Sequence, residues 1–150
     1  MQGIIIRMHL KILRNWSYKN NNMSNNITVG RRKASVARVR FIKGKGNIKI
    51  NNRTPKEYFK RESLVMEFKE PLAIVDFNNK YDILINVKGG GLSGQAGAAR
   101  LGIARSLLIV NPDFRGLLKE AGMLTRDSRV VERQKPGQTG ARKKFQFSKR

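Results

Sequence analysis

The stretch YDILINVKGGGLSGQAGAARLGIARSLLIVNP, residues 81–112, decides the fold. It opens on a strand pattern, because alternate positions of residues 81–88 are aliphatic. Residues 93–110 are rich in alanine and leucine at three- and four-residue steps, which is typical of a helix, and Asn111–Pro112 ends the pattern. A buried strand that passes through glycines into a long helix predicts a helix that packs closely on a sheet.

The glycines between this strand and helix match G-x-G-x-x-G at Gly89, Gly91 and Gly94, the pattern of a dinucleotide-binding loop. That fold also places an acidic residue at the end of the next strand, about 20 residues on. Here a helix ending in Asn-Pro-Asp lies at that distance. Three interpretations stay open: glycines that serve packing alone, packing together with an RNA phosphate at the helix start, and a nucleotide cofactor.

Two strands and a turn are predicted before this stretch. From Ser35 to Lys43 apolar and polar residues alternate, which predicts a half-buried strand with a cationic outer face that carries Arg38 and Arg40. The glycine-containing segment at residues 43–47 predicts a turn, and the isoleucines that follow predict a second strand. We therefore expect a hairpin.

Two helices and a last strand complete the pattern. A helix is expected from Thr54, whose capping signals are followed by apolar residues, up to Pro71, which stops it. Another is expected from about Asp113, with Gly122 as its C-cap, and a short strand over residues 127–134. This order of elements predicts an α+β fold in two layers.

The charge of the chain is large and concentrated at its ends. There are 32 Lys plus Arg against 10 Asp plus Glu, a formal charge of +22. Residues 1–60 hold 15 basic residues and one acid, residues 61–124 hold 8 and 7, and residues 125–150 hold 9 and 2. A solvated surface would carry interspersed signs. Cationic ends on a near-neutral body instead predict a polyanionic partner.

Several classes of function are excluded or disfavoured. The chain has no cysteine and a single histidine, His9, so it offers neither disulfides nor a thiolate or zinc site. No apolar run approaches the roughly 18 residues of a membrane span. No pair of carboxylates is marked for acid–base chemistry. We expect a protein that is not an enzyme, has no cofactor and no metal, and does not enter a membrane.

The chain divides into three parts: an N-terminal extension of residues 1–22, a globular domain of residues 23–136, and an extended tail of residues 137–150. The extension is basic and free of acid, whereas Met23 begins a segment that reads like an ordinary start. We expect it to be disordered or to reflect a start assigned too far upstream. A transit peptide and an RNA-binding extension are the alternatives.

The tail ends in GARKKFQFSKR, in which five of the last nine residues are basic. Its 14 residues can span about 45 Å at roughly 3.3 Å each, so an extended tail can enter crevices of folded RNA that a domain cannot. Phe145 and Phe147 lie among the cations. They either stack on unpaired bases or pack on sugar edges or the protein's own surface.

Four separate stretches carry a resemblance to one family. They are GRRKASVARV at 30–39, GGGLSGQAGAARLGIARSL at 89–107, LLKEAGMLTRDSRVVERQKPG at 117–137 and ARKKFQFSKR at 141–150. Together they resemble the universal S-nine family of small-subunit ribosomal proteins, in its bacterial form, over residues 27–150. Residues 1–22 have no counterpart in the family.

The resemblance implies a four-stranded sheet packed on helices, with a left-handed βαβ crossover and an extended basic C-terminal tail. It implies a place in the head of the 30S subunit, on the 3′ major domain of 16S rRNA and beside neighbouring head proteins, with the tail reaching peptidyl-site tRNA. The expected compartment is the ribosome of a bacterial cytoplasm, with an organelle ribosome as second choice. The chain is not expected to form a homo-oligomer.

The site residues follow from the same match. The tRNA-binding residues would be Ser148, Lys149 and Arg150. The rRNA-binding residues would be Arg31, Arg32, Lys33, Arg38, Arg40, Arg142, Lys143 and Lys144. Two other hypotheses remain: a free non-specific nucleic-acid-binding protein, and an enzyme that uses a nucleotide bound at the glycine loop.

Overall fold

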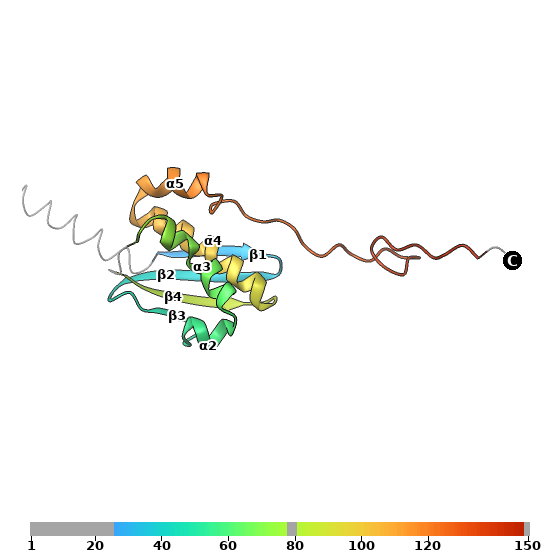
Figure 1. The fold of residues 1–150 in the computed structure, drawn as a ribbon, viewed down its shortest axis with the longest axis horizontal. Coiled ribbons are helices and arrows are strands. Elements are labelled where there is room, and N and C mark those ends of the chain that lie inside the picture. Colours follow the sequence, from blue (N-terminus) through green and yellow to red (C-terminus); the bar gives the residue numbers. More distant parts are fainter. Residues whose placement is uncertain (1–25, 78–80, 149–150) are drawn as a thin grey trace, which may run out of the picture.

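The computed structural model describes residues 26–77 and 81–148 of the 150-residue chain. The predicted extension of residues 1–22 lies outside the described residues. Helices form a layer on one face of a sheet, and the chain after residue 124 leaves this body as a long irregular tail (Figure 1). The predicted α+β fold of two layers with an extended tail is confirmed.

The sheet has four strands in the order β1-β2-β4-β3. Their bounds are β1 (Ile27–Arg32), β2 (Ser35–Lys43), β3 (Ile48–Ile50) and β4 (Tyr81–Lys88). The pairs β1–β2 and β2–β4 are antiparallel, whereas β3–β4 is parallel. A helical crossover joins the parallel pair, as the resemblance implies, and its left hand stays a prediction.

The predicted hairpin between residues 35–43 and 48–50 is wrong. Strand β2 is hydrogen-bonded to β1 on one side and β4 on the other, so β3 pairs with the free edge of β4 instead. The hairpin is β1–β2, joined by only two residues, of which Lys33 has a left-handed φ of 51°. The glycine-containing loop closes on Asp82, whose Oδ1 accepts the backbone N–H groups of Lys45 at 3.0 Å and Asn47 at 2.8 Å.

Four α-helices and one 3₁₀ turn lie in the described part of the chain. Their bounds are α2 (Pro55–Phe59), α3 (Glu62–Ile74), α4 (Leu92–Val110), η1 (Pro112–Phe114) and α5 (Arg115–Glu120). Thr54 and Glu57 form the predicted capping box, but the expected single helix breaks at Lys60, whose φ is 59°. Pro71 does not stop α3, which continues to Ile74. Its ring is buried, and it donates no backbone hydrogen bond within the helix.

Helix α4 packs directly on β1 because glycines face each other there. A Cβ on Gly30 would lie 1.9 Å from the Ala98 carbonyl oxygen and 2.5 Å from the Gly102 nitrogen. Beside this contact the Thr28 hydroxyl donates to the Gly102 carbonyl at 2.9 Å and also touches the Ser106 hydroxyl. The interpretation of the glycine-rich helix as a packing element is therefore confirmed.

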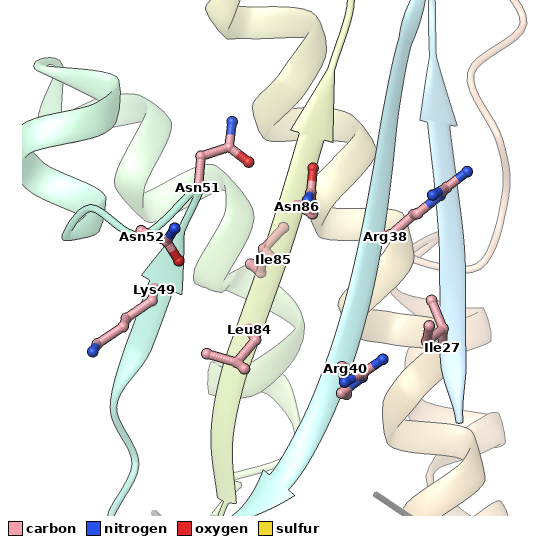
Figure 2. A pocket seen from close by; sticks show the side chains of 9 residues that line it. All are labelled: Ile27, Arg38, Arg40, Lys49, Asn51, Asn52, Leu84, Ile85 and Asn86. Carbon is pink, nitrogen blue, oxygen red and sulfur yellow. The ribbon is translucent and has the colours of Figure 1, made fainter. Parts of the chain in front are cut away.

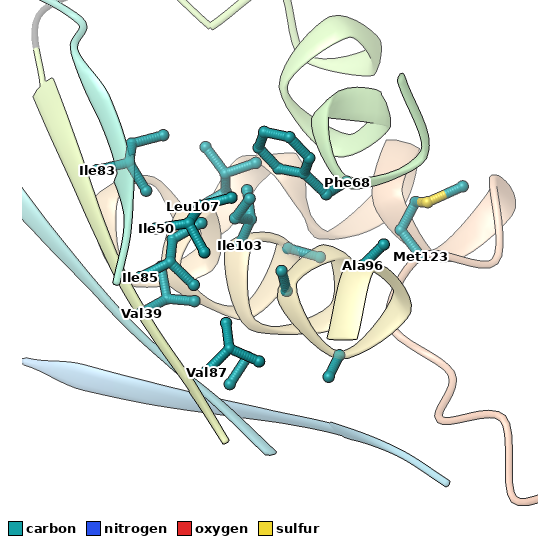
Figure 3. Packing of buried hydrophobic residues seen from close by; sticks show 14 of the residues in the cluster. Val39, Ile50, Phe68, Ile83, Ile85, Val87, Ala96, Ile103, Leu107 and Met123 are labelled. Atoms are coloured by element: carbon teal, nitrogen blue, oxygen red, sulfur yellow. The ribbon is translucent and has the colours of Figure 1, made fainter. Parts of the chain in front are cut away.

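The hydrophobic core lies between the inner face of the sheet and the helices (Figure 3). Inward side chains of β2 and β4, such as Val39 and Ile85, meet Phe68 of α3 and Ile103 and Leu107 of α4. The inward positions of β2 are those that the alternation predicted. No helix in the described ranges is long and apolar enough to cross a membrane.

The C-terminal segment is only partly as predicted. Gly122 does cap α5: it has a φ of 70°, its N–H donates to Lys119, and Met123 donates to the Leu118 carbonyl at 2.9 Å. The strand predicted over residues 127–134 is wrong, because this segment leaves the domain without a partner strand and exposes 87% of Val131. The last buried residue among those described is Met123. The domain boundary at residue 136 stays a prediction.

Candidate nucleic-acid interface

The two faces of the sheet differ in what covers them. The inner face carries the core, and in Figure 2 the helices lie behind the sheet. On the other face the outward side chains of Arg38, Lys49, Leu84 and Asn86 are exposed. Successive side chains of a strand point to opposite faces, so every second residue of each strand stands on this exposed side. We call these outward side chains of β1, β2, β3 and β4 the open face.

The open face is strongly cationic. Its basic side chains come from all four strands: Arg31, Arg38, Arg40, Lys49 and Lys88. Among the described strands the one acid in this alternation is Asp82, at the start of β4, where its carboxylate is bonded to the loop after β2. Cations from four strands without intervening acids present a positive surface to a polyanion.

Register places these side chains in rows across the strands. One row runs Lys49, Leu84, Arg40 and Ile27, because Leu84 is paired with both Lys49 and Arg40, and Arg40 with Ile27. The next row pairs Arg38 with Asn86. Between the rows lies a hollow of about 390 Å³ (Figure 2). It is a shallow site on the sheet, bounded by cations, amides and exposed aliphatic groups.

The structure places the sequence-predicted N-terminal cations in different surroundings. Arg31, Arg38 and Arg40 stand on the open face. Lys33 lies in the exposed turn between β1 and β2. Arg32 faces the helices, because it follows Arg31 directly and successive side chains of a strand point to opposite faces of the sheet.

Arg32 is held by carboxylates of the protein itself. Its Nη1 donates to Oε1 of Glu67 at 2.6 Å, and its Nη2 lies 3.6 Å from Oδ2 of Asp127. Hydrogen bonds from Arg129 hold the pKa of the Asp127 carboxyl well below its ordinary value. Asp127 therefore stays ionised, and Arg32 links β1 to α3 and to the root of the tail.

We predict that Arg32→Met lowers the free energy of unfolding by about 1–3 kcal/mol, because it leaves the partly buried Glu67 carboxylate without its charged donor. Arg31→Met, the neighbouring change on the open face, should alter it by no more than about 0.5 kcal/mol. Urea unfolding of both variants measures the difference. Equal stability losses would contradict the linking role of Arg32.

The tail presents its cations to solvent. Arg142 donates to Oε2 of Glu132 at 2.9 Å, but 88% of its side chain is exposed, so this pair holds it weakly. Lys143, Lys144 and Ser148 are exposed, whereas Lys149 and Arg150 lie outside the described residues. Phe145 and Phe147 are 69% and 90% exposed. In the free chain these rings do not pack on the protein's own surface.

Several residues of the interface were missed by sequence reasoning. They are Lys49, Asn52, Asn86 and Lys88 on or beside the open face. The alternation of β4 carried a signal for Asn86 and Lys88, because a strand with one covered face exposes every second residue. Asn52 gave no such signal, since its position depends on a turn that was not predicted.

The residues described offer no alternative metal centre. No group of three or more His, Cys, Asp or Glu that could hold a metal ion occurs among them.

The glycine loop between β4 and α4 is held by hydrogen bonds within the protein. The Gly89 carbonyl accepts from the Ser35 hydroxyl at 3.0 Å and from the Gln95 amide at 3.1 Å. These bonds tie the loop to β2 and to α4.

Comparisons with known proteins point to one family. The family model described as ribosomal protein S9/S16 matches residues 30–150. Two relatives named small ribosomal subunit protein uS9 come from Anaeromyxobacter sp. (strain K) and Anaeromyxobacter dehalogenans (strain 2CP-1 / ATCC BAA-258). Each is 59% identical over 125 residues, which cover 83% of this chain and 96% of the relative.

Proposed function

The chain belongs to the ribosomal protein S9/S16 family, and from this premise we propose that it is a structural constituent of the small ribosomal subunit that binds RNA at two places. The open face and the N-terminal cations hold the 3′ major domain of 16S rRNA in the 30S head. The basic tail reaches peptidyl-site tRNA. The protein contributes no catalytic group to either contact.

The observation that carries this proposal is the open face, where five cations from four strands stand on a sheet surface that no described helix covers. Each phosphate neutralised by such a cation releases a counterion, and this supplies binding that does not depend on sequence. Phosphate contacts position a protein on RNA without reading bases. That chemistry suits a structural role in a ribonucleoprotein.

The proposed partners are those expected for a protein in the head of the 30S subunit. They are 16S rRNA, peptidyl-site tRNA and neighbouring head proteins of the small subunit, in the ribosome of a bacterial cytoplasm. We propose rRNA contacts for Arg31, Lys33, Arg38 and Arg40, and for Arg142, Lys143 and Lys144 of the tail. Arg32 shapes the rRNA-binding part through its link to Glu67 and Asp127.

Co-sedimentation separates this function from that of a free nucleic-acid-binding protein. Full-length chain should enter small subunits that lack their own copy and stay bound when the salt concentration is raised, while an unrelated RNA duplex is released. If the chain dissociates equally from the small subunit and from the unrelated duplex at each salt concentration, the free nucleic-acid-binding protein is favoured.

Removal of the last three residues, Ser148–Arg150, should leave incorporation into the subunit nearly unchanged. It should weaken peptidyl-site tRNA about tenfold at moderate salt, since two phosphate-binding cations are lost. Filter binding of tRNA to programmed subunits measures this effect.

The double variant Lys149→Gln and Arg150→Gln keeps the length of the tail and should reproduce most of that loss. Wild-type tRNA affinity in both variants would contradict the contact. A loss only in the truncation would assign it to chain length and not to charge.

A further inference from the structure

The hollow on the open face has an aliphatic floor. Leu84 and Ile27 are 38% and 48% exposed, and they lie in one row with Arg40 between them. Both line the hollow, whereas the inward residues Ile83 and Val87 of β4 are buried in the core. Exposed aliphatic side chains give a flat ligand an apolar surface to lie on, and polar groups at the border can orient it.

Two amide side chains border this floor. Asn86 stands on β4 beside Arg38. Asn52 is placed by the tight turn after β3, which the paired bonds between Ile50 and Arg53 close, both at 2.9 Å. Asn51 and Asn52 adopt left-handed φ values of 46° and 66° in this turn, a conformation that asparagine tolerates better than most residues.

The neighbouring Asn51 shows what a structural amide looks like here. Its Nδ2 donates to the Val87 carbonyl at 3.0 Å and its Oδ1 accepts from the Val87 N–H at 2.9 Å. Asn52 and Asn86 make no such bond to described residues, so their donors and acceptors face the hollow or solvent. An amide offers two donors and an acceptor to one ligand.

Cations flank the same floor. Leu84 has Lys49 on one side and Arg40 on the other, and Arg38 stands in the next row. Strands are about 4.8 Å apart, so Lys49 and Arg40 start roughly 10 Å from each other. Phosphates on either side of one nucleotide can therefore be neutralised while its base lies on the floor.

An RNA duplex would leave the aliphatic floor without a role. Its deep major groove is closed to side chains, and its shallow minor groove is read by shape, hydroxyls and phosphates. The cations would bind its phosphates, and the amides could bond only its 2′-hydroxyls. An unpaired base instead packs on aromatic or other apolar side chains or on a guanidinium plane, and its edge is free for hydrogen bonds.

We propose that this hollow binds one unpaired nucleotide of RNA. Its base lies over Leu84 and Ile27, the amides of Asn52 and Asn86 bond its edge, and Arg38, Arg40 and Lys49 hold the flanking phosphates. This inference rests on the proposed function of the open face as an rRNA-binding surface. It adds that the face takes single-stranded RNA in preference to duplex.

The test compares variants of the full chain whose substitutions leave its net charge unchanged. Asn52→Gly with Asn86→Ala removes both amides, and glycine keeps the left-handed turn. Asn47→Ala, an exposed asparagine in the loop before β3, is the control. The probes are a labelled 12-nucleotide RNA of mixed sequence, the same strand annealed to its complement, and the same strand with abasic positions.

The double variant should bind the single strand about five- to a hundredfold more weakly, as expected for two lost hydrogen bonds. Its salt dependence, its melting temperature and its affinity for the duplex and the abasic strand should match those of the wild type. Asn47→Ala should match the wild type throughout. Unchanged affinity for the single strand, or an equal loss on the duplex, would overturn the proposal.

Co-sedimentation of the wild-type chain with small subunits distinguishes failure of the single-strand site from failure of the proposed ribosomal function. If the chain enters small subunits but the amide variant binds like the wild type, this inference fails and the proposed function stands. If the amide effect appears but the chain does not enter subunits, the single-strand site stands and the ribosomal assignment fails.

Discussion

Gly30→Ala should cost the free chain about 3 kcal/mol or more of unfolding free energy. The added Cβ would lie 1.9 Å from the Ala98 carbonyl oxygen and 2.5 Å from the Gly102 nitrogen. Both atoms belong to the backbone of α4, which cannot rotate away as a side chain would. Helix and sheet would have to separate along their contact, and overpacking of this kind is among the most damaging core changes.

Gly116→Ala is the matched control. Gly116 lies within α5, and a Cβ there would meet no atom within 4 Å. Alanine is the better helix former, so this change should raise stability by about 0.5–1 kcal/mol. Urea unfolding followed by circular dichroism gives both values. A loss below 1 kcal/mol for Gly30→Ala would contradict the close packing of α4 on β1.

The second large effect is expected on RNA binding. Arg38→Gln, Arg40→Gln and Lys49→Gln together should weaken binding to a 16S rRNA 3′-domain transcript about a hundredfold near 0.1 M salt. Loss of three phosphate contacts should also reduce the salt slope by about 2–3. Titration of labelled RNA at several salt concentrations measures both. Folding stability should not fall, because the variant relieves repulsion in a chain of +22.

A control triple variant removes the same charge elsewhere. The residues changed to glutamine, Lys56, Lys60 and Arg61, lie on or beside α2, and none of them belongs to a strand or lines the hollow. This variant should lose little more than the general effect of net charge. The same loss of affinity in both triple variants would show that only total charge matters and that the open face is not the binding surface.

Much of the fold was predictable where one pattern dominated. Strand β4 and helix α4 have clear periods and clear ends, so they were predicted within a residue or two. The β1–β2 hairpin was missed because its two-residue turn is Lys33–Ala34, which lacks the glycine or asparagine typical of such turns. Pairing partners depend on contacts between distant segments, and a single strand pattern does not carry that information.

The site was predictable in composition more than in placement. Charge placement indicated a polyanion partner, and the alternation around Arg38 and Arg40 gave their outward direction. Arg32 looked equivalent to Arg31 in the sequence, yet it serves a link to Glu67 and Asp127. Those two carboxylates are 35 and 95 residues further along the chain, so only the folded arrangement could identify them.

Cross-linking mass spectrometry on small subunits that contain this chain tests the RNA-binding role of the open face most directly. If the sheet binds rRNA, nucleotide adducts should fall on peptides of β2 and β4 that carry Arg38, Arg40 and Asn86, and on the tail. Adducts confined to the helix layer, on peptides of α2 and α3, with the open face free, would contradict that role.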